Sequence, residues 1–229
     1  MSGAAGTRRF GTGPLSRVSA LVYTLLIVEL LVLLTAVPGL VALVLLDRDA
    51  ANVPLMAACL LPAGPALSAA LYALRHRGTE LTELRPAAAF WRGYRLNFGA
   101  ALKVWAPWLL VLALVGTNLS NFAAAGVPGW WAVLLVVLAA GGTLWVVNAL
   151  VITSLFAFRA VDVAKLAAYA LGRFPAATLA NACLLIVAAG VTLAATEAAL
   201  ALLASAFAAT LLWNSRAMIT EVQQRFTRQ

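Results

Sequence analysis

The chain has 229 residues, of which 64% are hydrophobic and 10% are charged, with a mean hydropathy of +0.97 and a formal net charge of +8. This composition excludes an ordinary soluble domain, and the longest polar stretch, 75–97, is far too short to form a catalytic core by itself. We therefore expect an all-α polytopic membrane protein. Its positive charge is expected to face the anionic headgroups of the lipid bilayer, with no role in binding nucleic acid.

Six apolar stretches define the expected fold. They lie at 18–46, 53–74, 98–116, 130–158, 175–195 and 198–213. A membrane-spanning helix needs about 20 apolar residues. We therefore predict a membrane domain of six transmembrane helices over 18–215, preceded by an N-terminal segment, 1–17, and followed by a C-terminal tail, 216–229.

The basic residues fall almost entirely on one side of this pattern. Arg48, between the first and second spans, is the exception among the 16 Lys and Arg residues. The others lie in the N-terminal segment, in the connections between the second and third spans and between the fourth and fifth spans, and in the tail. Lys103 lies just inside the third span. The positive-inside rule then places both termini in the cytoplasm. The abundance of Arg, Ala and Leu suggests a bacterial source, so we predict a multi-pass protein of the bacterial cytoplasmic membrane.

An aromatic and basic pattern follows the second span. Pro86 can begin a helix, and aromatic residues then recur at helical spacing on one side while arginines face elsewhere. The aromatic residues are Phe90, Trp91, Tyr94 and Phe98, and the arginines are Arg92 and Arg95. We predict an amphipathic helix on the cytoplasmic surface before the third span, with its aromatic side either at headgroup depth or docked on the bundle.

A weaker pattern of the same kind precedes the fifth span. Val163, Leu166, Ala170 and Phe174 lie on one stripe of a potential helix, so one or two interfacial helices are expected in total. The order of span, surface helix, Phe and span thus occurs twice. This order has two explanations, an internal duplication or chance in an Ala-rich sequence, and Ala-rich helices readily produce such matches by chance.

Four charged or amide side chains lie within the predicted spans. Glu29 is the most unusual, because inserting an acid deep in a membrane costs on the order of 2.5–3.5 kcal/mol. It is either a proton- or cation-linked site or an acid hydrogen-bonded to a neighbouring helix. Lys103 either reaches toward Glu29 or extends to the cytoplasmic interface. Asn148 and Asn181 either form hydrogen bonds between helices or line a solute path with Glu29.

Prolines indicate where helices are interrupted. Pro62 and Pro65 remove two backbone donors from the second span, which must kink or unwind there. In the long first span, Pro38 and Gly39 mark the place where a break would fall.

Several classes of chemistry are excluded by what the sequence lacks. It has no nucleotide-binding glycine loop, no Gly-x-Ser-x-Gly and no His-Glu-x-x-His motif. With one histidine and the isolated Cys59 and Cys183, neither a zinc site nor a haem site is expected. We therefore expect no cofactor, no metal and no enzymatic activity.

Two segments carry a family resemblance. These are PAGPALSAALYALR at 62–75 and AFWRGYRLNF at 89–98, a proline followed by a small-residue helix ending in Arg, then an aromatic and basic motif leading into a span. They resemble the YesL-like family of small bacterial integral membrane proteins. The loop at 78–84 departs from that pattern by being longer and less basic. The resemblance implies an unknown biochemical activity, often associated with carbohydrate uptake, and supplies no catalytic residues.

Two functional hypotheses follow from these observations. In the first, the chain is a non-catalytic accessory or assembly partner of a membrane transport system for carbohydrates, contacting a permease or ATPase through Phe90, Trp91, Tyr94 and Arg95. In the second, it is a small proton- or cation-linked transporter or channel that uses Glu29. A transporter of this kind would act alone or as a homo-oligomer.

Overall fold

The computed structural model describes residues 14–47, 49–77 and 85–226, and within these ranges it contains helices and no strand. The expected all-α membrane bundle is confirmed. Residues 1–13 of the predicted N-terminal segment, Arg48, the loop 78–84 and the last residues of the predicted tail, 227–229, lie outside the described residues. The helices are α1 (Pro14–Leu45), a 3-10 turn (Ala50–Asn52), α2 (Val53–Cys59), α3 (Ala63–Arg75), α4 (Pro86–Ser120), α5 (Phe122–Ala125), α6 (Trp130–Leu155), α7 (Ala160–Arg173), α8 (Pro175–Ala194), α9 (Glu197–Ala201), α10 (Ala204–Asn214) and α11 (Arg216–Phe226).

Within the described residues, five helical segments are long and apolar enough to cross a membrane, so the predicted count of six spans is not exact. The five are Ser16–Leu45, Ala50–Arg75, Pro86–Ser120, Trp130–Leu155 and Pro175–Ala194. The sixth predicted span, 198–213, is divided into the short α9 and the longer α10. Hydropathy could not reveal this division, because residues 198–213 carry no charged side chain and contain neither Pro nor Gly.

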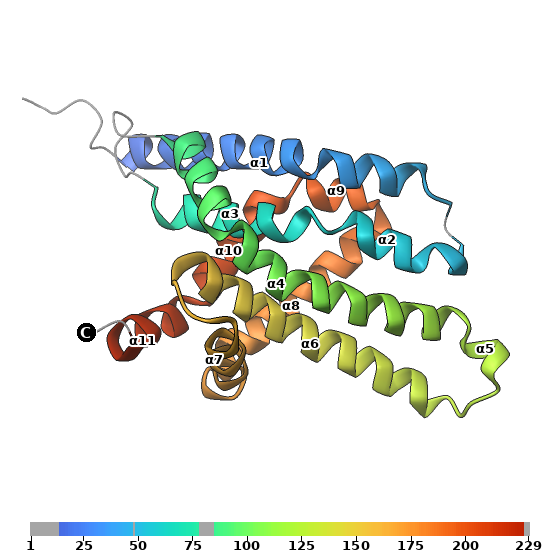
Figure 1. Ribbon diagram of the computed structural model, residues 1–229. Helices are drawn as coiled ribbons and strands as arrows, with labels where there is room; N and C mark the ends of the chain where they lie inside the picture. Colours follow the sequence, from blue (N-terminus) through green and yellow to red (C-terminus); the bar gives the residue numbers. More distant parts are fainter. Residues whose placement is uncertain (1–13, 48, 78–84, 227–229) are drawn as a thin grey trace, which may run out of the picture.

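The long helices run side by side, and α3 lies in the centre of the bundle (Figure 1). It packs against α1, α4, α6 and α10. Most of its residues are buried, among them Ala66, Ala70 and Leu71, each with no exposed surface. A helix that is apolar on all sides is typical of a buried position, and the small side chains of α3 allow its neighbours to approach closely.

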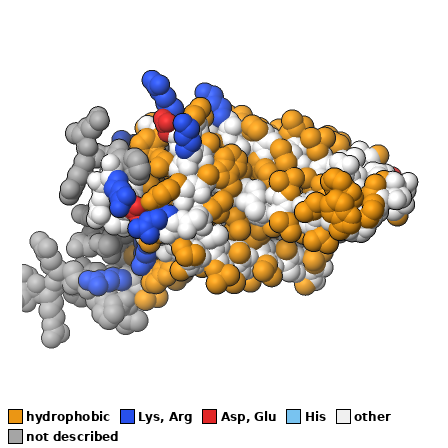
Figure 2. Space-filling model, turned by 90° about the horizontal axis from the view of Figure 1, so that it is seen from below, with side chains coloured by type: hydrophobic (Ala, Val, Ile, Leu, Met, Phe, Trp, Pro, Cys, Tyr) orange, Lys and Arg blue, Asp and Glu red, His pale blue; other side chains and the backbone are white. Residues whose placement is uncertain are grey.

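Charge is distributed unevenly along the bundle. In Figure 2 the Lys and Arg side chains gather at one end, and hydrophobic side chains cover most of the remaining visible surface. We call this the basic end. It is formed by the start of α1, the end of α3, the start of α4, and by α7 and α11 (Figure 1). Large exposed side chains such as Leu110, Val137 and Ile186 cover the rest of the bundle. An apolar surface of this extent is that of a membrane protein.

The two expected interfacial helices differ in how they join their spans. The first is not a separate element, because α4 is one continuous helix of 35 residues that includes both the aromatic pattern and the third span. The second is separate, since Pro175 stands at the first position of α8 and cannot continue α7. In α7, Val163, Ala167 and Ala170 are buried, so this helix docks on the bundle.

Two further segments depart from a simple succession of spans. Helix α1 continues through Pro38, and no break occurs there. Instead, a side chain at Gly39 would collide with the Cys59 carbonyl group, so this glycine permits the close approach of α2. In the C-terminal segment, α11 buries Met218, Ile219 and Val222 against the core. The segment after the last span is thus an amphipathic helix that packs on the basic end.

Candidate functional site

The interruption of the second span lies at residues 60–62, between α2 and α3. Pro62 is the residue before α3 and Pro65 lies in its first turn, where the missing backbone N–H groups are tolerated. The carbonyl oxygen of Leu60, at the end of α2, accepts a hydrogen bond from the Trp105 indole nitrogen of α4 at 2.9 Å. The same oxygen accepts a bond of 3.1 Å from the Ala63 N–H, so Trp105 supplies a second donor, from another helix, to a carbonyl group that the break removes from the regular helical pattern.

Glu29 lies at the second interruption, between α9 and α10. Its Oε2 atom accepts a hydrogen bond of 2.7 Å from the backbone N–H of Ser205, in the first turn of α10. The residue before α10, Leu203, supplies no side-chain cap. The carboxyl group of Glu29 therefore acts as a cap supplied by another helix, where the positive end of the α10 dipole also favours it. Its second oxygen, Oε1, is buried and has no hydrogen-bond partner among the described residues.

The other predicted polar residues do not assemble around Glu29. Asn181 of α8 is 4% exposed and accepts a hydrogen bond of 3.0 Å from the side chain of Asn214, at the end of α10. Asn148 of α6 is 5% exposed. Lys103 is exposed on α4, and within the described part of the chain it forms no salt bridge with Glu29. The Asn181 contact is a hydrogen bond between helices, and the exposed Lys103 is free to extend toward an interface.

The inner side of the first turns of α4 is packed on the bundle. Phe90 has no exposed surface and belongs to the main core, so its proposed role in contacting a partner is wrong. A Cβ atom at Gly93 would lie 2.7 Å from Cβ of Tyr72 on α3, and the Asn97 side chain donates a hydrogen bond of 3.0 Å to the Ser154 carbonyl of α6. Helical spacing alone groups Phe90 with the other aromatic residues on one surface. In the structure it lies on the face of α4 that is buried against the bundle.

The outer side of the same turns remains exposed. Trp91 is 39% exposed and Phe98 is 43% exposed, while Arg92 and Arg95 are also exposed. Tyr94 lies between the two faces, with its ring 5.7 Å from that of Trp91 and 5.4 Å from that of Phe98. Trp91, Arg95 and Phe98 follow the i, i+4, i+7 spacing of one helical stripe. We call the set of Trp91, Arg92, Arg95 and Phe98 the α4 outer face.

Among the described residues there is no group of three or more His, Cys, Asp and Glu side chains that could hold a metal ion. Cys59 and Cys183 are both free thiols. The polar side chains at the two helix breaks are those of Trp105, which donates a hydrogen bond, and Glu29, which accepts one.

Sequence reasoning missed the partners of these residues. Trp105, Ser205 and Asn214 each contact a residue far away in the chain, and for Ser205 and Glu29 the separation is 176 positions. The signal for Trp105 was weak but present, since an indole N–H within a span needs an acceptor and the prolines of the second span leave carbonyl groups without donors. For Ser205 the sequence carries no comparable signal.

Comparison with known proteins gives one match. Residues 20–119 match the family described as "Protein of unknown function, DUF624", a range that includes most of α1, all of α2 and α3, and nearly all of α4. The match confirms the resemblance to the YesL-like family of unknown function. No curated protein and no solved structure matches the chain.

Proposed function

We propose that this membrane protein is a non-catalytic assembly partner of a membrane transport system, and that it contacts a permease or its ATPase through the α4 outer face. The observation that carries the proposal is the division of α4: Phe90 and Gly93 pack inward, while Trp91 and Phe98 remain outside. Aromatic and Arg side chains are enriched among the residues that dominate protein interfaces. A carbohydrate system is the first candidate, because of the association that the family resemblance implies.

The position of the α4 outer face supports a protein partner near the membrane surface. It lies at the basic end, which the positive-inside rule assigns to the cytoplasm, where the ATPase and the cytoplasmic loops of a permease are accessible. Its stripe of Trp91, Arg95 and Phe98 has the i, i+4, i+7 spacing by which helices anchor in a groove. The whole stripe also falls within the residues that match the family.

The test is co-purification from mild detergent at native expression level, followed by mass spectrometry of the bound proteins. We expect a stoichiometric permease or ATPase with the unmodified chain, and its loss in the Trp91→Ala/Phe98→Ala variant. Phe90 is left intact, because truncating a fully buried Phe costs about 3–5 kcal/mol and would unfold the bundle.

A matched control is available on the same helix. Leu110 and Leu114 are 64% and 58% exposed but lie farther along α4, within the apolar part of the bundle. The Leu110→Ala/Leu114→Ala variant removes comparable apolar surface and is expected to keep the partner. A solitary species from the unmodified chain, or equal retention by both variants, contradicts the proposal.

A second candidate function rests on Glu29. Its carboxyl group meets the N-terminus of α10 at a helix break, and discontinuous helices of this kind form ion and substrate sites in secondary transporters. The test is flux in proteoliposomes under a pH or cation gradient. A transporter would show flux from the chain alone that Glu29→Gln abolishes. An absence of flux in the unmodified protein excludes this candidate and leaves Glu29 with the capping role.

A further inference from the structure

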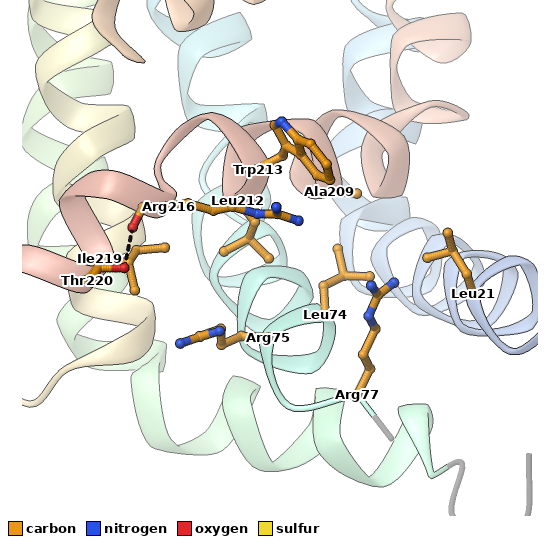
Figure 3. A pocket seen from close by; sticks show the side chains of 10 residues that line it. All are labelled: Leu21, Leu74, Arg75, Arg77, Ala209, Leu212, Trp213, Arg216, Ile219 and Thr220. Carbon is orange, nitrogen blue, oxygen red and sulfur yellow. Dashed lines mark hydrogen bonds between the residues drawn. The ribbon is translucent and has the colours of Figure 1, made fainter. Parts of the chain in front are cut away.

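A cavity opens at the basic end between α1, α3, α10 and α11, with a volume of about 480 Å³ (Figure 3). Its residues fall into two chemical groups. Guanidinium groups come from Arg75, the last residue of α3, from Arg77, two residues after it, and from Arg216 at the start of α11. The other lining residues are Leu21, Leu74, Ala209, Leu212, Trp213, Ile219 and Thr220.

Among the described residues, no acid pairs with the three arginines of this cavity. None of the described residues that line the cavity is Asp or Glu, and none of the three arginines forms a salt bridge with another described residue. Arg75 donates a long hydrogen bond of 3.5 Å to the neutral side chain of Gln223. By contrast, Arg173 and Arg225, also at the basic end, both lie within 4 Å of Glu221, at 3.9 and 3.4 Å. Within the described part of the chain, the cavity therefore concentrates positive charge with no acid paired to it.

One of the three arginines stacks on an aromatic ring. The Arg216 guanidinium carbon lies 3.5 Å from the centre of the Trp213 ring, a cation–π contact. Figure 3 shows Arg216 beneath Trp213, and Arg77 extending beside Leu74 on the side facing Leu21, whereas Arg75 points toward α11. Stacking on Trp213 holds one guanidinium in a fixed plane, which favours the bidentate recognition of a phosphate group.

The apolar part of the cavity distinguishes a lipid from a free anion. Leu21 and Trp213 continue into exposed apolar surface, since Trp213 is 64% exposed and the neighbouring Val18 and Val22 of α1 are 58% and 49% exposed. A free phosphate ion would use the guanidinium groups and leave this surface unoccupied. A phospholipid would use both, with its headgroup among the arginines and its acyl chains along α1 and α10.

We propose that this cavity is a binding site for one anionic phospholipid, whose phosphate is held by Arg75, Arg77 and Arg216 and whose glycerol region lies against Leu21, Ala209 and Trp213. Basic cavities between transmembrane helices on the cytoplasmic side are suited to such headgroups. The volume lies within the range of small-molecule sites and accommodates the polar part of the lipid, with the acyl chains outside. The site is independent of any protein partner.

The test uses the full chain, purified in detergent and titrated with phosphatidylglycerol or phosphatidylcholine, with the bound lipid counted by native mass spectrometry. We expect one phosphatidylglycerol molecule to remain bound at concentrations where phosphatidylcholine does not. In the Arg75→Gln/Arg77→Gln/Arg216→Gln variant the affinity for phosphatidylglycerol should fall on the order of 100-fold, since each of the three basic residues near the surface contributes about a factor of five.

Two controls separate a built site from general attraction to a basic protein. The Arg159→Gln/Lys165→Gln/Arg173→Gln variant loses the same charge from α7 and the residue before it, at the same end, but leaves the cavity intact, and it should retain phosphatidylglycerol. The Ala209→Trp variant keeps every arginine but fills the cavity, and it should lose at least about tenfold in affinity. All these substitutions except Ala209→Trp are at exposed side chains, where effects on folding are within about 0.5 kcal/mol.

Three outcomes would overturn the proposal. Equal losses in the two triple variants would mean that the lipid is attracted by net charge alone. Unchanged affinity in Ala209→Trp, with the protein folded, would place the lipid outside the cavity. Displacement of phosphatidylglycerol by millimolar inorganic phosphate would identify a free anion as the ligand.

Discussion

Two of the predicted spans are interrupted, and a backbone group at each interruption is hydrogen-bonded by a side chain from another helix. The side chain is a donor at one interruption and an acceptor at the other. Between α2 and α3, the Leu60 carbonyl accepts a hydrogen bond from the Trp105 indole. Between α9 and α10, the Ser205 backbone N–H donates to Glu29. The first break leaves an acceptor to be satisfied at the end of a helix, so its partner is a donor. The second leaves a donor at the start of a helix, so its partner is an acceptor.

The comparison also separates breaks by their origin. Pro62 and Pro65 interrupt the second span through their own covalent structure, which would apply in any surroundings. Residues 198–213 contain no such residue, so the interruption there depends on a contact made from α1. An unsatisfied backbone group within a membrane costs several kcal/mol. Removing the hydrogen-bonding side chain should therefore destabilise the protein more at the break between α9 and α10, where no proline ends the helix.

The largest effect is expected at the second break. Glu29→Ala removes the acceptor of the Ser205 N–H group, and we expect the free energy of unfolding to fall by about 2–3 kcal/mol. Glu29→Gln keeps a neutral acceptor, so its loss should be at most about half as large. Reversible unfolding in mixed micelles measures both variants. Equal losses in the two would show that the hydrogen bond to Ser205 is not what Glu29 contributes to stability.

A smaller effect is expected from crowding the first break. A Cβ atom at Gly64 would collide with the Trp105 ring, so Gly64→Ala should cost about 1–3 kcal/mol. Gly99, on α4, has open space where its Cβ would lie, and Gly99→Ala should be neutral or stabilising by about 0.5–1 kcal/mol. Thermal unfolding in detergent distinguishes them. A Gly64→Ala variant as stable as Gly99→Ala would mean that Trp105 is not held against α3.

The smallest effect is expected from removing the donor at the first break. Trp105→Phe deletes the indole N–H but keeps an aromatic ring, and the Leu60 carbonyl still accepts a bond of 3.1 Å from the Ala63 N–H. The expected loss is about 1 kcal/mol, below that of Glu29→Ala. If Trp105→Phe proved the more damaging substitution in the same unfolding experiment, the contrast between the two breaks would be reversed.

Helix-forming and apolar patterns predicted much of the architecture, because these are properties of local sequence. They identified an all-helical membrane protein, the start of α4 at Pro86 and the one-sided distribution of basic residues. They also placed Phe90 with Trp91 on one surface, although the structure buries the first and exposes the second. Spacing defines a stripe along a helix, but which part of that stripe meets α3 depends on how the two helices pack.

The amino-acid sequence by itself determined the class of the protein, because a chain that is 64% hydrophobic must place its helices in lipid. It also determined the break at Pro62 and the depth of Glu29, since both follow from residue type and position along an apolar stretch. Only the tertiary structure decided that Glu29 caps α10, that the sixth span is divided, and that Arg75, Arg77 and Arg216 surround one cavity. These features join residues from separate helices, and hydrogen bonding and charge act between groups that only folding brings together.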